Sequence, residues 1–247
     1  LAPRIAAVLG DDVLDRVEPG LALDDGRRVR DLGEVVSANA YLGAEPLLDA
    51  LRTGATIVVS GRVADPSLAL APLMHVHGWA ADDWRMMARG TAVGHLLECA
   101  GQLTGGYFAD PGRKDVDGLA RLGFPHADVW PDGRAVFGKP EGSGGRLDLR
   151  TAREQLLYEV LDPRAYLTPD AAADFTSIAL RDLGGDRVEM TGGEGAPRPG
   201  QLKVSIGYRA GHVGEGEISY AGPGAEARAR MAGEIVRARL GDGFEEL

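Results

Sequence analysis

A repeated order of short apolar run, loop and helical periodicity constrains the first 110 or so residues most strongly. Apolar runs at residues 5–9, 34–37 and 56–60 predict three short strands, and the third is β-branched and bounded by glycines. Helical periodicity follows at residues 45–52, and Asp65-Pro66 is typical of the start of another helix, with Asp as N-cap and Pro at the first helical position. Alternating strands and helices favour a parallel sheet with helices on its faces.

The pattern changes in the second half of the chain. Asp132-Gly133 lies between two apolar runs, which predicts a hairpin, and Gly184-Gly185 predicts a second one. We therefore expect an α/β fold, with a mostly parallel sheet and flanking helices in the first half and an α+β arrangement with hairpins in the second half. The other predicted elements are helices at 81–89, 91–101, 151–160 (opened by a capping box) and 225–240, and strands at 202–208 and 215–220.

Composition excludes several classes of function. The 27 basic and 37 acidic side chains give a net charge of −10, which argues against nucleic acid or an anionic membrane as a partner. No apolar run approaches the roughly 18 residues of a membrane span. A single cysteine, Cys99, excludes an internal disulfide framework, and together with the absence of a leader sequence it favours the cytoplasm.

Polar side chains follow each of the three predicted strands. Ligands bind beyond the carboxyl ends of the strands in open parallel sheets, so we expect these side chains to share one crevice. Arg62 is suited to hold a carboxylate or phosphate in a bidentate manner. The alternative is that Arg62 and Asp65 form a local salt bridge and that Asp65 only caps a helix. The side chains are Asp11, Asp12, Ser37, Asn39, Ser60, Arg62 and Asp65.

Two glycine-containing loops are weaker candidates for binding an anion. The backbone N–H groups of Gly105 and Gly106 are able to cradle an oxyanion, although a helix end followed by a turn explains the same residues. Lys139 precedes a second loop at residues 142–145, ahead of a helix N-terminus. Neither loop has the spacing of a nucleotide or dinucleotide fingerprint, and the sequence has no motif for a redox cofactor.

His95, Glu98, Cys99 and Gln102 follow one another at helical spacing and share a helix face. His and Glu three residues apart is a spacing used for metal ligands, but no motif supplies further ligands, so we predict no metal site. Polar groups facing a crevice, or a hydrogen-bonded core histidine, explain the pattern as well. A lone cysteine within a helix is usually buried and inert rather than nucleophilic.

Several long motifs follow one another along the chain: SANAYLGA (37–44), SGRVAD (60–65), GHLLEC (94–99), TGGYFAD (104–110) and EQLLYE (154–159). They continue through Asp162-Pro163, residues 166–170 and Asp174-Phe175. Together these motifs resemble the acyclic terpene utilisation family of AtuA-like proteins, and the resemblance covers nearly the whole chain.

The resemblance implies one AtuA-like α/β domain over residues 1–247, with a subdivision into 1–122 and 123–247 as the alternative. We expect the chain to be a piece of a longer protein, because the family's N-terminal segment and small C-terminal domain are absent from it. Proteins of this kind accompany the breakdown of acyclic terpenes through branched acyl-CoA intermediates, so the resemblance implies a pathway more firmly than a reaction.

Two functions are consistent with these observations. The first is an enzyme that acts on a branched acyl-CoA thioester or a carboxylic acid by hydration, hydrolysis or isomerisation, with a small-molecule substrate. The second is a non-catalytic subunit that binds a partner enzyme of the pathway; in either case a homo-oligomer is an option. The predicted catalytic residues are Asp65, His95 and Glu98, and the predicted substrate-binding residues are Asn39, Arg62, Gly105, Gly106 and Tyr107.

Overall fold

The computed structural model describes residues 2–212 and 214–241. The chain forms two compact units, Leu1–Arg209 and Ala210–Leu247. The subdivision considered at residues 122/123 does not coincide with this boundary. Among the described residues, no helix is both long and apolar enough to cross a membrane.

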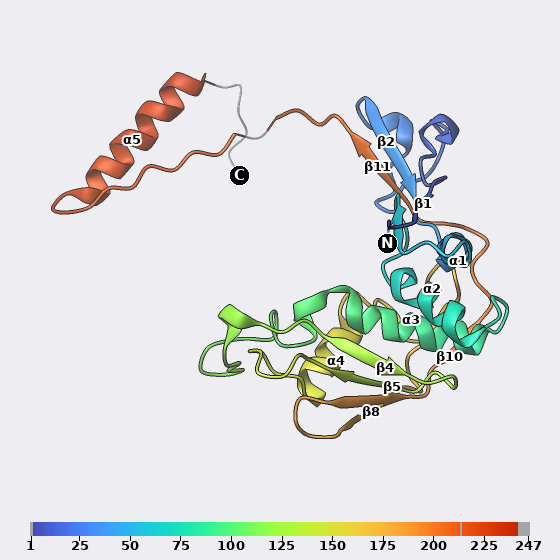
Figure 1. The fold of residues 1–247 in the computed structure, drawn as a ribbon. Helices are drawn as coiled ribbons and strands as arrows, with labels where there is room; N and C mark the ends of the chain where they lie inside the picture. The colour runs from blue at the N-terminus through green and yellow to red at the C-terminus, as the bar shows by residue number, and fades with distance from the viewer. Residues whose placement is uncertain (1, 213, 242–247) are drawn as a thin grey trace. The chain divides into compact units, whose positions relative to one another are not determined.

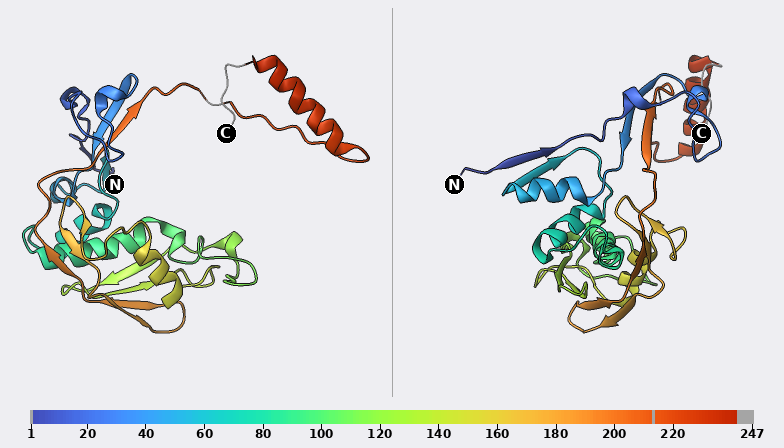
Figure 2. Two further views of the ribbon diagram at one scale, coloured as in Figure 1. Left: turned by 180° about the vertical axis from the view of Figure 1, so that it is seen from behind. Right: turned by 90° about the vertical axis from the view of Figure 1, so that its right-hand side faces the viewer.

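A parallel pair of strands supports the first part of unit 1. β1 (Ile5–Val8) pairs with β3 (Ile57–Ser60), with Ile5 opposite Ile57 and Val8 opposite Ser60. Helix α1 (Ala44–Arg52) lies along the pair, as Figure 2 shows, and buries Leu47 and Leu48 against it. The three elements are those predicted from the alternation of apolar runs and helical periodicity.

The second predicted strand does not join this parallel pair. β2 (Val35–Ala40) pairs antiparallel with β11 (Val204–Tyr208), so within the described residues the first half has one parallel pair and not a mostly parallel sheet. The sequence of β2 explains the difference, because exposed Ser37 and half-buried Asn39 alternate with buried Ala38 and Ala40. A strand that alternates in this way suits an antiparallel ribbon with one wet face.

Helix α3 (Trp84–Glu98) is one continuous helix where the sequence predicts two. Asp83 caps it by accepting a hydrogen bond from the Met86 N–H, and Gly90 lies in its interior. A Cβ at Gly90 would lie 2.4 Å from a methyl carbon of Leu70 on α2 (Ser67–His77). The glycine is therefore a site of close helix packing and not a helix end.

The second half of unit 1 is built on antiparallel strands (Figure 1). Both predicted hairpins are present, in a four-stranded sheet of order β4-β5-β9-β8. A second sheet has the order β10-β7-β6. The bounds are β4 His126–Val129, β5 Ala135–Gly138, β8 Ala179–Asp182, β9 Val188–Thr191, β6 Tyr166–Leu167, β7 Ala172–Asp174 and β10 Glu194–Ala196.

Of the remaining predicted elements, α4 and the strand at 215–220 differ from the prediction, and α5 agrees with it. Helix α4 (Leu149–Leu157) starts earlier than the predicted residue 151, because Asp148 rather than Thr151 is the N-cap and forms the capping box with Thr151. The predicted strand at 215–220 is not formed, whereas α5 (Ala225–Leu240) of unit 2 has the predicted bounds. Short 3₁₀ turns complete the described structure at Leu14–Arg16, Val29–Asp31, Ala100–Gln102 and Leu119–Arg121.

Helix α3 belongs to both hydrophobic cores of unit 1. Its N-terminal Met86 and Met87 pack with α1 and α2, whereas Val93 and Leu96 pack with β5, β7 and β9. Helix α3 therefore connects the α/β part of unit 1 to its antiparallel part.

Asp170 ties the N-termini of two helices together. Its Oδ1 accepts a hydrogen bond from the Ala44 N–H at the start of α1 (2.7 Å), and its Oδ2 accepts one from the Ser67 hydroxyl at the start of α2 (2.5 Å). All three residues are buried. Burial raises the pKa of the Asp170 carboxyl, and the two donors oppose this shift. A carboxylate at the N-termini of two helices is also favoured by their dipoles.

We predict that Asp170→Ala lowers the free energy of unfolding by about 2–4 kcal/mol, because it leaves a buried N–H and a buried hydroxyl without an acceptor. Asp170→Asn keeps a carbonyl acceptor and should lose less. Denaturant unfolding of both variants measures the effect. The control is Asp49→Ala, which removes an exposed ion pair with Arg52 on α1 and should change stability by less than about 1 kcal/mol. An equal loss in the control and in Asp170→Ala would contradict the bridging role.

Candidate functional site

A pocket of about 410 Å³ lies at the carboxyl ends of β1 and β3, where the sequence predicts a crevice. The segment after β1, the end of β2 and the loop from β3 to α2 each contribute to it. Asn39, Arg62 and Asp65, three of the predicted site residues, are brought together here. The full lining is Asp11, Asn39, Ser60, Gly61, Arg62, Val63, Asp65 and Leu68.

Asp11 fastens the three segments of the pocket to one another. Its Oδ2 accepts hydrogen bonds from the Asn39 side-chain amide (2.9 Å) and from the Arg62 main-chain N–H (2.8 Å). The Arg62 N–H, supported by the Asn39 amide, lowers the pKa of the Asp11 carboxyl. Gly61 makes room for this carboxylate, because a Cβ there would lie 1.9 Å from Asp11 Oδ1. Asn39 is therefore a structural partner of Asp11 as well as a lining residue.

The side chains of Arg62 and Asp65 are not engaged in the way the alternative interpretation requires. Within the described residues they form no ion pair with each other. Helix α2 begins at Ser67, its N-cap is Pro66, and no side chain caps it. The prediction that Asp65 is the N-cap is therefore wrong. Both charged groups line the pocket, and the Arg62 guanidinium also lies over the Tyr41 ring.

Glu98, the third predicted catalytic residue, is not among the residues that line the pocket. Burial raises the pKa of the Glu98 carboxyl, and the negative charges of Asp65 and Glu159 raise it further. The Cys99 thiol donates to Glu98 Oε1 over 3.1 Å. Burial and this carboxylate raise the pKa of Cys99 to about 12, so the thiol stays protonated at neutral pH and is not a nucleophile. Glu98 thus holds its proton more tightly than an exposed glutamate.

His95 is a core residue and does not line the pocket. It is 1% exposed, and its ring packs against Tyr166 and Phe175 with centroid distances of 5.1 and 5.6 Å. Burial lowers the pKa of the imidazole. Its main-chain carbonyl accepts a hydrogen bond from the Gln155 side chain (2.9 Å). In the described part of the chain, no three His, Cys, Asp or Glu side chains gather in a way that suits a metal ion.

The glycine loops do not present free N–H groups. The Gly105 N–H donates to the Gln102 carbonyl (3.0 Å) and the Gly106 N–H to the Gly101 carbonyl (2.8 Å), so neither is directed at a ligand. Tyr107 is 77% exposed and lies outside the pocket lining. Lys139 is buried in an ion pair with Asp186 (3.1 Å), which explains it without an anion.

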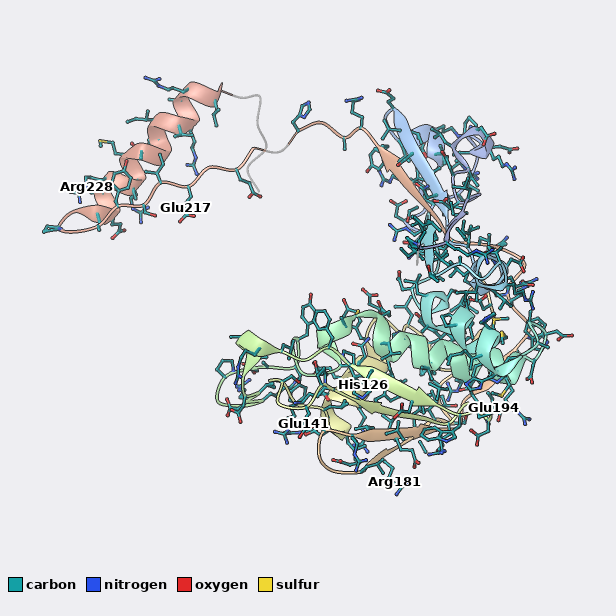
Figure 3. The ribbon with its side chains drawn as sticks, in the orientation of Figure 1. His126, Glu141, Arg181, Glu194, Glu217 and Arg228 are labelled. Atoms are coloured by element: carbon teal, nitrogen blue, oxygen red, sulfur yellow. The ribbon has the colours of Figure 1, made fainter. Side chains whose placement is uncertain are left out.

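A second groove, of about 720 Å³, surrounds Glu194, which Figure 3 labels. Both arginines of this groove have partners within the protein. Arg85 forms an ion pair with Glu194 (3.1 Å), and Arg89 donates to the main-chain oxygens of Asp132 and Gly193. The pocket at Asp11 and Asp65 is therefore the better candidate site.

Sequence reasoning missed residues that reach the site from distant segments. Asp170 holds the start of α1 and α2 beside the pocket, but nothing in the sequence links it to Ala44 and Ser67. Lys203 comes next to Tyr41 only because β11 pairs with β2. The local sequence pattern therefore predicted the pocket itself, whereas Asp170 and Lys203 reach it through contacts between segments that are far apart in the sequence.

The comparison with known families agrees with the motifs described above. The family model described as acyclic terpene utilisation family protein AtuA matches residues 1–247. The chain belongs to this family. Membership ties this AtuA family protein to the utilisation of acyclic terpenes. No curated protein and no solved structure gave a significant match.

We predict that Gly61→Ala raises the pKa of Asp11, because the new methyl group displaces the carboxylate from the Arg62 N–H and the Asn39 amide. NMR titration of the carboxyl carbons measures this change. Since the depressed pKa makes Asp11 stabilising above its unfolded value near 3.8, the variant should also lose stability at neutral pH and little below the folded pKa.

The control is Gly20→Ala, where a Cβ meets nothing within 4 Å. It should leave the titration of Asp11 unchanged. An unshifted Asp11 in Gly61→Ala would show that this carboxylate does not fasten the pocket.

Proposed function

We propose that this AtuA family protein is an enzyme that acts on a branched acyl-CoA thioester or carboxylic acid of acyclic terpene breakdown. The observation that carries the proposal is the pocket in which Arg62 and Asp65 converge from one loop without pairing with each other. Arg62 is suited to bind an anionic group of the substrate. Asp65 adds a carboxylate to the same pocket, which a simple binding surface for an anion does not need.

Acid–base chemistry suits the two carboxylates. In this proposal Glu98, whose carboxyl has a raised pKa, acts as the general acid, and Asp65, which lines the pocket, acts as the general base. A carboxyl group whose environment raises its pKa is typical of a general acid. Hydration, hydrolysis and isomerisation each need a proton removed at one atom and delivered at another. His95 is omitted from the pair, because it is enclosed by Tyr166 and Phe175.

We predict that Asp65→Asn and Glu98→Gln each lower the turnover of a CoA thioester of a branched terpenoid acid by about 10²–10⁴-fold. Activity that needs protonated Glu98 falls as pH rises through its raised pKa, so Glu98→Gln should also remove this fall from the pH profile. Product formation followed by mass spectrometry across a pH series measures both effects.

Asp82→Asn is the matched control, because Asp82 is a carboxylate of the second groove. It should keep the wild-type rate and pH profile. Wild-type rates in Asp65→Asn and Glu98→Gln would exclude this acid–base pair, and a loss confined to Asp82→Asn would move the site to the other groove.

A binding subunit is the second candidate function, and one observation favours it. The face of the β1–β3 pair away from α1 is apolar and exposed, with Ile5 66%, Leu9 82% and Val59 57% exposed. Parallel strands are usually covered on both faces. Retention of stable binding to a pathway enzyme in Asp65→Asn, together with loss of binding in Val59→Lys, would support this function over catalysis.

A further inference from the structure

Tyr41 lies where three distant segments of unit 1 meet. Its main-chain N–H donates to the carbonyl of Lys203 (2.9 Å), just beyond the β2–β11 pairing, and its hydroxyl accepts a hydrogen bond from Ser205 on β11 (3.3 Å). The next N–H, of Leu42, donates to the carbonyl of Arg62 (3.2 Å). Backbone pairing on both sides therefore holds Arg62 and Lys203 beside the same aromatic ring.

Two cations contact that ring. The Arg62 guanidinium carbon lies 5.1 Å from the centroid of the Tyr41 ring, and the Lys203 ammonium lies 4.9 Å from it. Both side chains belong to exposed residues, and in the part of the chain that the structure describes neither forms an ion pair or a side-chain hydrogen bond. The ring offsets part of their mutual repulsion, because its face attracts cations.

A second aromatic ring in the same unit shows the contrast. Lys114 and Arg150 lie 4.6 and 5.4 Å from the centroid of Phe108. There each cation has a carboxylate partner, since Lys114 pairs with Glu154 (2.8 Å) and Arg150 with Asp148 (3.3 Å), an aspartate that also pairs with Arg146. The two cations at Phe108 are thus paired with carboxylates, whereas the two cations at Tyr41 have no carboxylate paired with them in the described structure.

The position of the Tyr41 cluster connects it to the candidate site. Arg62 belongs both to this cluster and to the pocket lining. Asp11, one of the two carboxylates that line the pocket, accepts hydrogen bonds from the Asn39 amide and the Arg62 N–H, so two donors already offset its charge. A ligand in the pocket can therefore extend an anionic group past Arg62 toward Lys203.

We propose that Tyr41, Arg62 and Lys203 form a binding site for a phosphate group of the molecule that occupies the pocket. A guanidinium binds two phosphate oxygens in parallel and an ammonium adds a point charge, so the pair matches a dianion better than a single carboxylate. The inference rests on the proposed function in that it names the substrate class of the same site. The phosphate belongs either to the nucleotide portion of a CoA thioester or to a phosphorylated terpenoid.

Inorganic phosphate is the first probe, because it tests the cluster without any assumption about the reaction. We expect ³¹P NMR titration to give a dissociation constant that rises about five- to tenfold in Lys203→Gln, as expected for the loss of one charge-assisted contact. Lys203→Arg keeps the charge and should restore most of the affinity. Increasing salt should weaken binding less in Lys203→Gln than in the wild type.

Lys114→Gln is the matched control, since it removes a lysine that also lies over an aromatic ring but has a carboxylate partner. It should bind phosphate as the wild type does. Equal affinities in the wild type, Lys203→Gln and Lys114→Gln would overturn the proposal, and so would a loss in Lys203→Gln that Lys203→Arg does not restore.

Further ligands separate the two sources of the phosphate. Tighter binding of free CoA than of pantetheine, lost in Lys203→Gln, supports the nucleotide portion of a thioester. Tighter binding of geranyl monophosphate than of geraniol, lost in the same variant, supports a phosphorylated terpenoid. A Lys203→Gln variant that leaves all four affinities unchanged contradicts both.

The same variants distinguish failure of this inference from failure of the proposed function. If phosphate binding depends on Lys203 while Asp65→Asn and Glu98→Gln keep the wild-type rate, the phosphate site stands and the acid–base pair falls. If those two variants lose activity while Lys203→Gln leaves the affinity for inorganic phosphate unchanged, the acid–base pair stands and the phosphate site falls.

Discussion

The carboxylate of Asp170 fixes the relation between the two helices that lead away from the pocket. It accepts hydrogen bonds from the first turn of α1 and from the first turn of α2, from a loop more than a hundred residues further along the chain. Gly43 allows this approach, because a Cβ there would lie 2.5 Å from Asp170 Oδ1. The loop that carries Arg62 and Asp65 ends at Ser67, so its path depends on where Asp170 holds that serine.

Asp11 plays the corresponding role on the other side of the pocket. One carboxylate oxygen joins the segment after β1 to the end of β2 and to the loop after β3. Together the two aspartates hold the backbone of the site by accepting hydrogen bonds, while Arg62 and Asp65 remain available to a ligand.

The sequence predicted elements well where the signal is local. The strand at β3, helix α1, both hairpins and α5 follow from β-branched runs, helical periodicity and Gly-containing turns. Prediction from the sequence was wrong where contacts between distant segments determine the bounds of an element or its partner. Gly90 has the appearance of a helix end, yet it lies inside α3 because α2 packs against it. β2 follows the predicted strand, but its partner is β11, about 165 residues away, and no local pattern encodes that choice.

The candidate site shows the same limit. Arg62 and Asp65 were predictable because they follow β3, whose carboxyl end meets that of β1 at one edge. Asn39 lies near the end of β2, which is not part of that pair, and it reaches the pocket through its hydrogen bond to Asp11. His95 was misplaced because helical spacing gives the face of a helix but not what covers that face. Tyr166 and Phe175, which enclose its ring, come from β6 and from the residue after β7.

The hydrogen bond from the Cys99 thiol to the Glu98 carboxylate affects how this protein can be labelled. The chain's one thiol remains in its unreactive form at neutral pH, so maleimides and mild oxidants will modify it slowly while the carboxylate stays beside it. Any event that moves or neutralises Glu98 will make the sulfur easier to label. Cys99 is therefore a native chemical reporter of the state of the adjacent residue, Glu98.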